Sequence, residues 1–385
     1  MDFDDPDTGV ERYWHQQRAF LARSGYRLRP KFNPDFAFKI SGLGRRALKE
    51  YRTHHWRSTI MDAERICDGH KVMLKSVSTK LHPNEVKIAQ FFSSPPHVGN
   101  PRNHCIPIFE VLQDLDDPDK QILVMPHFIA FDQPRFDTVG EVVDCFRQIF
   151  EGLQYMHENF VAHRDCGIMN LLQDPTQLYP AGFHPVHTRR DPSFEGNALH
   201  ITRTECWPRF YIIDFGLSHQ YDPAEGVPFE DVIRGGDKSP PEHRHDACNP
   251  FPTDIYFLGN LLKDEFLYST HPYDYIDSRR FIHDPLDFLT PLLDDMTLKD
   301  PAQRPTISEV IQRFDDLCRP LGWWHLRQPG QKLYWTDVVP HRWKQFKRVL
   351  RRVPAVPPYT PPAVTPLSDG MRRFYTQTDQ AASPR

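Results

Sequence analysis

Five short segments between residues 163 and 305 combine acidic, basic and amide side chains in one order. They read His163-Arg164-Asp165-Cys166-Gly167-Ile168-Met169-Asn170, then Asp214-Phe215-Gly216, then Pro240-Pro241-Glu242, then residues 254–259 and 300–305. Their carboxylate and carboxamide oxygens can accept a proton or bind a metal ion. Each segment alone is a weak signal, whereas all five in this order form a strong one.

The order and spacing resemble the protein kinase superfamily. Its pattern is H-R-D-x-x-x-x-N, D-F-G, a variant of A-P-E, an Asp-led helix and a late arginine. The resemblance extends over about residues 30–318 and is closest over 139–306. It implies a divergent, fungal-type protein kinase-like protein that binds ATP and Mg²⁺ between two lobes. Phosphoryl transfer depends on positioning and on charge neutralisation more than on covalent chemistry.

The resemblance gives Asp165, Asn170 and Asp214 their expected roles. Asp214 would bind the Mg²⁺ that bridges the β- and γ-phosphates, and Asn170 would bind a second Mg²⁺. Asp165 would act as the base towards the attacking hydroxyl of a protein substrate, whose identity the sequence leaves open.

The first half of the chain supplies the expected nucleotide contacts. Lys75 stands where the family places the lysine that grips phosphate, and Glu85 on the next helix would pair with it. The alternative for Lys75 and Glu85 is a surface ion pair worth about 0–1 kcal/mol. Adenine would meet the carbonyl of Pro126 and the N–H of Phe128, where the lobes join.

Three further residues resemble structural positions of the family. Glu242 and Arg304 would form a buried ion pair that anchors the segment after the metal site. Asp254 would bond the backbone around the His163-Arg164 pair, and its alternative is an ordinary helix N-cap. These side chains would support the fold rather than turnover.

The sequence departs from the family at two points that concern phosphate. The glycine-rich loop should fall near 53–58, where no glycine occurs. The histidines and the arginine of this segment could supply positive charge for phosphate instead, or the segment could be a solvated turn. A competing alignment uses Gly42 and Gly44. Gly167 replaces the usual catalytic-loop lysine, so slower transfer is expected.

Two functions therefore stay open, with a third less favoured. The first is an active phosphotransferase, of Ser/Thr type, and the second is a pseudokinase that serves as a nucleotide-binding or interaction scaffold. A small-molecule kinase is the third, and Glu242 with Arg304 argues for the protein kinase branch instead. The enzyme is favoured because both expected metal ligands are present.

Composition agrees with a folded α+β protein. The 385 residues include 37 prolines and 19 glycines, and hydrophobic residues make up 39%, which excludes a disordered or collagen-like chain. A net charge of −4 argues against nucleic-acid binding.

Three features of the sequence bear on location. No apolar run is long enough for a membrane span, and the acidic N-terminus argues against a signal peptide there. The seven scattered cysteines indicate a reducing compartment. We therefore expect a cytoplasmic protein, with a nuclear location as the alternative.

Hydrophobic periodicity predicts where the elements lie. Helices are expected over 10–24, 84–92, 139–159, 254–268, 286–296 and 306–318, and strands over 71–75, 121–125 and 211–213. The predicted organisation is an N-terminal helical extension over 1–29 and a kinase-like domain over 30–318. Its N-lobe, a small antiparallel sheet plus one helix, spans 30–126, and its mainly helical C-lobe spans 127–318 with an insertion at 175–208. A basic and proline-rich tail spans 319–385.

Histidines and cysteines inside this domain suggest two candidate zinc sites, each with a weak sequence signal. Zinc could be bound by His184, His187, His200 and Cys206 of the insertion, or by the pattern His243-x-His245-x-x-Cys248. Their spacing matches no standard site, so solvated histidines are favoured. Cys166 is interpreted as a small buried thiol rather than a reactive one.

The tail contains six cations and no acid over 342–352, followed by a proline-rich stretch over 354–366. Trp343, Phe346, Val349, Leu350 and Val353 share a helix face opposite the cations. The favoured interpretation is a helix docked on the body with its basic side in water. The alternatives are an acidic-partner, membrane-surface or calmodulin-like target, and an SH3 ligand in the proline-rich stretch.

Overall fold

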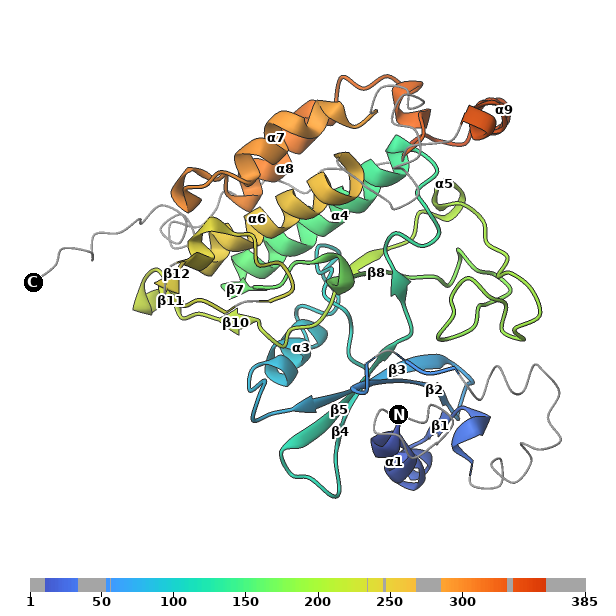
Figure 1. Cartoon of the computed structure of the whole chain (residues 1–385), viewed down its shortest axis with the longest axis vertical. Coiled ribbons are helices and arrows are strands. Elements are labelled where there is room, and N and C mark those ends of the chain that lie inside the picture. Colours follow the sequence, from blue (N-terminus) through green and yellow to red (C-terminus); the bar gives the residue numbers. More distant parts are fainter. Residues whose placement is uncertain are drawn as a thin grey trace, which may run out of the picture. The chain divides into compact units, whose positions relative to one another are not determined.

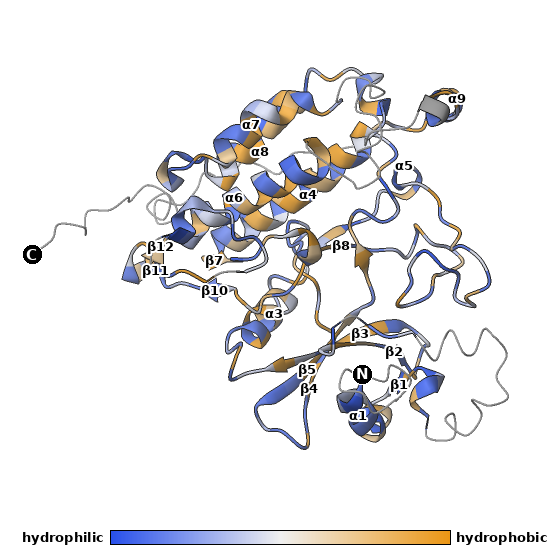
Figure 2. Ribbon diagram, viewed as in Figure 1, coloured by the Kyte–Doolittle hydropathy of each residue, from blue (hydrophilic) through white to orange (hydrophobic). Residues whose placement is uncertain are grey.

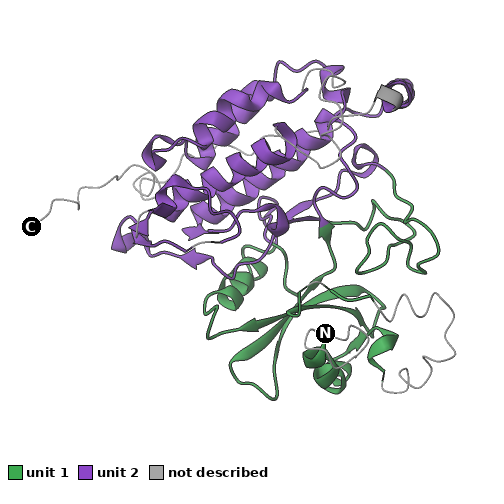
Figure 3. Cartoon of the chain, in the orientation of Figure 1, with its two compact units in different colours: residues 1–98, 106–129, 174–201 green, residues 99–105, 130–173, 202–385 purple. Residues whose placement is uncertain are grey.

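A computed structural model describes residues 11–33, 53–55, 57–233, 235–244, 247–267, 285–330 and 335–357. The chain is a mixed α/β protein with two compact units (Figure 3). Unit 1 comprises residues 1–98, 106–129 and 174–201, and unit 2 comprises residues 99–105, 130–173 and 202–385. Each unit is described by itself.

Unit 1 is built on a five-stranded antiparallel sheet (Figure 1). In sheet order the strands are β1 (Tyr26–Leu28), β2 (Ile60–Arg65), β3 (Lys71–Ser78), β5 (Lys120–Pro126) and β4 (Glu110–Gln113). The turn between β2 and β3 contains the Asp68-Gly69 pair, and Gly69 has a φ of 73°, which favours glycine. The strands predicted over 71–75 and 121–125 are confirmed as parts of β3 and β5.

Two α-helices among the described residues belong to this unit, and both correspond to helices expected from the sequence, over 10–24 and 84–92. Helix α1 (Arg12–Arg23) packs on one face of the sheet, where Trp14 and Leu21 join a buried cluster with Met61, Val72 and Val124. Helix α3 (Glu85–Ser93) follows β3. Because β1 pairs with β2, the sheet already begins inside the segment 1–29 that the sequence indicated as a separate extension.

Unit 2 is mainly helical. Its longer helices are α4 (Val139–Glu158), α6 (Pro250–Leu262), α7 (Thr290–Met296), α8 (Ile307–Cys318) and α9 (Trp335–Leu350), with the short α5 (Arg203–Cys206) and a π-helical turn at Lys263–Leu267. Apolar bands run along α4, α6, α7 and α8 (Figure 2). The core helix α4 is buried along most of its length, and Phe150 of α4 meets Phe314 of α8 with ring centroids 5.3 Å apart. The helices predicted over 139–159 and 306–318 are confirmed.

Short strands of this unit frame the functional segments. Strand β8 (Leu171–Gln173) lies between β9 (Phe210–Ile212) and β6 (Ile129–Ala130), where the chain passes from unit 1 to unit 2. Strand β7 (Val161–Ala162) pairs with β10 (His219–Gln220), and β11 (Glu230–Asp231) pairs with β12 (Ala247–Cys248). The strand predicted over 211–213 is therefore present, shifted by one residue.

The predicted insertion and the predicted tail are both part of the two units. Residues 175–201 of the insertion group with unit 1, whereas its residues 202–208 group with unit 2. The predicted tail contributes α9 to unit 2, and its segment before α9 packs on α4, since the Val139 N–H donates to the Gln328 carbonyl at 2.9 Å. Among the described residues, no helix is long and apolar enough to cross a membrane.

Candidate active site

The segment 163–170, called the HRD loop below, holds Asp165 in a network of hydrogen bonds within unit 2. Asn170 donates through Nδ2 to the Asp165 carbonyl at 2.8 Å and to Asp165 Oδ2 at 2.9 Å. The backbone N–H of Gly236 donates to the other carboxylate oxygen, Oδ1, at 2.8 Å. A Cβ atom on Gly235 would lie 2.3 Å from that oxygen, so the close approach requires glycine. Both oxygens of Asp165 are thus oriented by neighbours.

Asp214 lies beside Asn170 in the fold because their strands pair. Asn170 immediately precedes β8 and Asp214 follows β9, and the Ile213 N–H donates to the Asn170 carbonyl at 2.9 Å. Asp214 has a φ of 67°, a left-handed conformation that is strained for a residue with a Cβ. The Gly216 N–H donates to its carboxylate at 3.3 Å. One end of a two-strand ladder thus presents a carboxylate and a carboxamide.

Asp254 fixes the backbone of the HRD loop, as the sequence predicted. Its two carboxylate oxygens accept the backbone N–H groups of His163 at 2.8 Å and Arg164 at 2.7 Å. His157 contacts the same carboxylate at 3.0 Å. Asp254 is fully buried inside α6, whose N-cap is Asn249, so the alternative N-cap interpretation was wrong. Arg164 has a φ of 69°, and these bonds hold that strained conformation.

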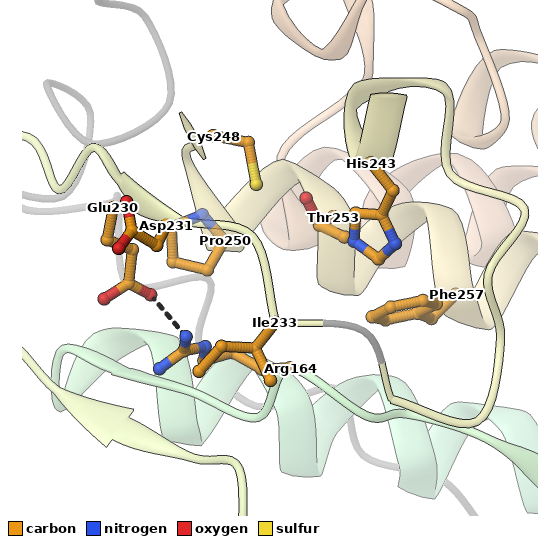
Figure 4. A pocket seen from close by; sticks show the side chains of 9 residues that line it. All are labelled: Arg164, Glu230, Asp231, Ile233, His243, Cys248, Pro250, Thr253 and Phe257. Atoms are coloured by element: carbon orange, nitrogen blue, oxygen red, sulfur yellow. Dashed lines mark ion pairs between the residues drawn. The ribbon is translucent and has the colours of Figure 1, made fainter. Parts of the chain in front are cut away.

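The Arg164 side chain pairs with the segment that follows Asp214 (Figure 4). Its Nη2 atom lies 3.0 Å from Glu230 Oε1, and the Tyr221 hydroxyl donates to the same carboxylate at 2.5 Å. The cavity beside this pair has a volume of about 20 Å³ and is also lined by His243 and Thr253. Such a volume accommodates about one water molecule. The cavity is therefore too small for a nucleotide or a peptide side chain.

Glu242 and Arg304 form the expected buried ion pair. Arg304 donates through Nη1 and Nη2 to the two carboxylate oxygens of Glu242 at 2.6 and 2.7 Å. Burial alone would raise the pKa of Glu242, but the bonds from Arg304 outweigh it and lower that pKa. Thr253 donates to the same carboxylate at 2.7 Å, and Arg304 also reaches the carbonyls of Pro252 and Leu298. This pair anchors the 3₁₀ turn Pro241–Arg244 to α6.

Unit 1 brings Lys75 and Glu85 together. The Lys75 ammonium lies 2.5 Å from Glu85 Oε1, with Glu85 buried and the Lys75 side chain 16% exposed. Lys75 points to the sheet face opposite the α1 core, since its neighbour Leu74 is in that core and side chains alternate along a strand. The pair is therefore more shielded than a surface ion pair.

The two backbone groups expected to meet adenine contact each other. The Phe128 N–H donates to the Pro126 carbonyl at 3.1 Å, which closes a tight turn after β5. Between them, His127 is buried and packs on Phe183 of the segment 174–201 at 5.4 Å between ring centroids. Burial lowers the pKa of His127 to about 4. A ligand that used both groups would have to replace this hydrogen bond.

A buried charge cluster occupies the sheet face that carries Lys75. Asp62 on β2 pairs in register with Met73, two residues before Lys75, and its carboxylate lies 2.7 Å from His55 Nε2 and 3.0 Å from Arg29 Nε. Burial alone would raise the pKa of Asp62, but His55 and Arg29 lower it.

The expected solvated turn at 53–58 was wrong for His55 only. His55 is buried against Asp62, whereas His54 is exposed and lies 2.8 Å from the buried Glu11. Buried carboxylates draw this segment onto the unit because an unpaired charge is costly there. The competing glycines, Gly42 and Gly44, lie outside the described residues.

The described residues contain no group of three or more His, Cys, Asp or Glu that could hold a metal ion. His184 and His187 instead pack on Phe194, with ring centroids 4.6 and 5.3 Å away. His245 lies outside the described residues. Cys166 is buried, and burial raises the pKa of its thiol well above the usual value, which makes it unreactive as expected. The zinc interpretations therefore gain no support.

Sequence reasoning missed two features of the site. The first is the contact of Gly236 with Asp165, for which the only signal in the sequence was the Gly235-Gly236 pair. The second is the cluster around Asp62, which a lone carboxylate between Met61 and Ala63 in a strand could have revealed. Both depend on contacts between residues that are distant in sequence.

Comparison with known proteins supports a kinase relationship at a coarse level. No family model matches the chain. A protein of Acanthamoeba polyphaga mimivirus, named as a serine/threonine-protein kinase, is 23% identical over 270 residues, which are 63% of this chain and 86% of the viral protein. A protein of Ceratodon purpureus, named as a light-sensor protein kinase, is 24% identical over 261 residues, 60% of this chain and 18% of that protein. The chain is thus similar to distant relatives that are named as protein kinases.

Proposed function

We propose that this protein is an ATP- and Mg²⁺-dependent kinase-like phosphotransferase that acts on protein hydroxyls. The observation that carries the proposal is the oriented group formed by Asp165, Asn170 and Asp214 at the start of β8 and the end of β9. The names of the two relatives support a kinase at the coarse level. The Ser/Thr type, the fungal character and the bilobal kinase layout stay predictions.

The donor set of unit 2 fits Mg²⁺, which prefers oxygen ligands. Asp214 would supply a carboxylate and Asn170 its carboxamide oxygen, since the Asn170 nitrogen already donates to Asp165. Bound Mg²⁺ would neutralise charge on the phosphates. Asp165, whose two oxygens are held by Asn170 and Gly236, would accept a hydrogen bond from the attacking hydroxyl in exchange for one of these partners.

Unit 1 would contribute the phosphate contact through Lys75. The Glu85 carboxylate fixes the ammonium group and stays buried beside it, so that Lys75 is oriented before a ligand arrives. The Pro126 carbonyl and the Phe128 N–H would bind adenine after their mutual hydrogen bond opens.

The scaffold alternative is favoured by that same hydrogen bond. If Phe128 and Pro126 stay bonded to each other, and His127 stays packed under Phe183, adenine has no edge to pair with. Gly167, which stands where the family usually has a lysine, also favours the scaffold, because the transition state would lack the charge of that lysine. Such a protein would bind partners without transferring phosphate.

The test measures ATP binding by calorimetry with and without Mg²⁺. Wild type is expected to bind ATP with Mg²⁺, Asp214→Ala to lose at least tenfold in affinity, and Asp316→Ala to match wild type. Asp316 is the matched control because it is a half-exposed carboxylate of α8 in the same unit. Absence of ATP binding by folded wild type would contradict both the enzyme and a nucleotide-binding scaffold.

A further inference from the structure

Helix α9 exposes a continuous apolar stripe on the surface of unit 2. Val339, Trp343, Phe346 and Leu350 recur at intervals of four, three and four residues, which places them on one helix face. Their exposed fractions are 73%, 58%, 47% and 68%. The rings of Trp343 and Phe346 stack with centroids 5.6 Å apart. At 1.5 Å per residue the stripe is about 16 Å long.

The opposite face of α9 docks on unit 2 through polar side chains. His341, Gln345 and Arg348 are buried, and Arg348 contacts Asp137 and Thr202. The Asp137 carboxylate also accepts hydrogen bonds from Lys344 at 3.0 Å and Gln345 at 3.1 Å. The expected docking through the apolar face was therefore wrong, because Asp137 draws Lys344 and Arg348 inward and leaves the apolar stripe outside. The other cations of the helix stay exposed, as expected.

Exposed cations flank the stripe on both sides. With about 100° of rotation per residue, Arg342 falls on one side of the stripe, and Lys347 and Arg351 fall on the other. All three are exposed, and the Lys347 ammonium lies 5.4 Å from the centroid of the Trp343 ring. The sequence 338–353 contains no acidic residue. The charge around the stripe therefore fits an anionic partner and opposes pairing of two copies.

We propose that α9 docks the protein on a membrane surface that carries anionic lipid headgroups. An apolar ridge of Trp, Phe and Leu between Lys and Arg side chains is the composition of helices that lie in the membrane interface. The stripe stands on the outside of a single helix, so a flat bilayer can receive it without a matching groove. Anionic headgroups attract the flanking cations over about a Debye length.

The experiment is flotation of the full chain with vesicles of phosphatidylcholine containing 30% phosphatidylserine, at about 0.1 M salt. Wild type is expected to float with these vesicles and to bind at least tenfold less to pure phosphatidylcholine. Trp343→Gln combined with Phe346→Gln should lower binding at least tenfold. Arg342→Gln combined with Lys347→Gln should lower it several-fold and weaken its salt dependence. The four side chains are exposed, so the melting temperatures should stay unchanged.

The matched control combines Leu81→Gln with Leu115→Gln, two exposed leucines of unit 1, and should bind like wild type. Failure of wild type to bind anionic vesicles, or equal binding by the Trp343 and Phe346 double variant, would overturn the proposal. A chain that dimerises through the stripe in sedimentation velocity would also overturn it. Binding to an acidic amphipathic peptide but to no vesicle would assign the stripe to a protein partner instead.

Discussion

Asp254 shows how one buried carboxylate determines the backbone of a functional loop. Its oxygens accept two consecutive N–H groups, and the second belongs to Arg164, whose φ of 69° is strained. The Asp165 side chain is presented by this backbone, so its position depends on a residue that lies about 90 positions later.

The Glu242–Arg304 pair provides a prediction about stability. Arg304→Ala would leave a buried carboxylate without its partner, at a cost of about 3–5 kcal/mol in the free energy of unfolding. A fall in the melting temperature of roughly 10 °C is expected in a thermal scan. Arg319→Ala, which removes an exposed arginine paired with Asp316, is the control and should change little. Equal melting temperatures for Arg304→Ala and wild type would show that the pair contributes nothing.

Asp144 provides a prediction about pH. Burial in α4 raises the pKa of Asp144 to about 7, although Gln148 donates to its carboxylate at 3.0 Å. The folded state therefore binds a proton more tightly than the unfolded state. This contribution to stability is complete below pH of about 4 and is lost as pH rises to about 7.

Asp144→Asn removes this dependence because the amide stays neutral. In urea unfolding, the variant should equal wild type near pH 4 and exceed it by up to about 4 kcal/mol at pH 8. The exposed Asp316→Asn is the control for general charge effects and should follow wild type. A stability difference that does not change between pH 4 and 8 would contradict the raised pKa.

At the scale of elements, periodicity predicts the long helices well because each buries one face. The expected helix over 139–159 corresponds to α4, and the expected strand over 121–125 to β5. Strand β1 was missed because its three residues, Tyr26–Leu28, are too short to show a period. The grouping of 174–201 with unit 1 depends on contacts such as His127 with Phe183, which no local pattern reports.

The orientation of α9 was mispredicted for a related reason. A hydrophobic stripe usually faces the body, but here the decisive interaction is the ion pairing of Asp137 with Lys344 and Arg348. Asp137 lies about 200 residues before them, so the helix sequence alone contains no sign of it.

Asp137→Ala is expected to release α9 from unit 2. Removing the shared carboxylate deletes the ion pairs of Lys344 and Arg348 with Asp137, and the helix then opens more often. Limited trypsin digestion should cleave within 342–352 at least tenfold faster than in wild type. Asp117→Ala, at an exposed turn of unit 1, is the control and should be cleaved at the wild-type rate. Unchanged protection would mean that other contacts hold the helix.

At the scale of the whole molecule, the two units divide the expected chemistry between them. Unit 1 contains Lys75, paired with Glu85, and unit 2 contains Asp165, Asn170 and Asp214. Residue types and order were sufficient to nominate all five side chains. They could not show that Gly236 contacts Asp165, because these residues are 71 positions apart in the sequence. They also could not show that Phe128 bonds to Pro126, because that bond joins backbone groups and is independent of residue type.

The most direct test of the account is transfer of labelled γ-phosphate from Mg-ATP to a generic protein substrate and to the chain itself. Wild type should transfer phosphate, and Asp165→Asn should be at least a hundredfold slower while it keeps its melting temperature and its affinity for Mg-ATP. The loss should therefore appear in turnover and not in binding. Transfer by Asp165→Asn at the wild-type rate, or no transfer by wild type that binds Mg-ATP, would contradict the proposed phosphotransferase.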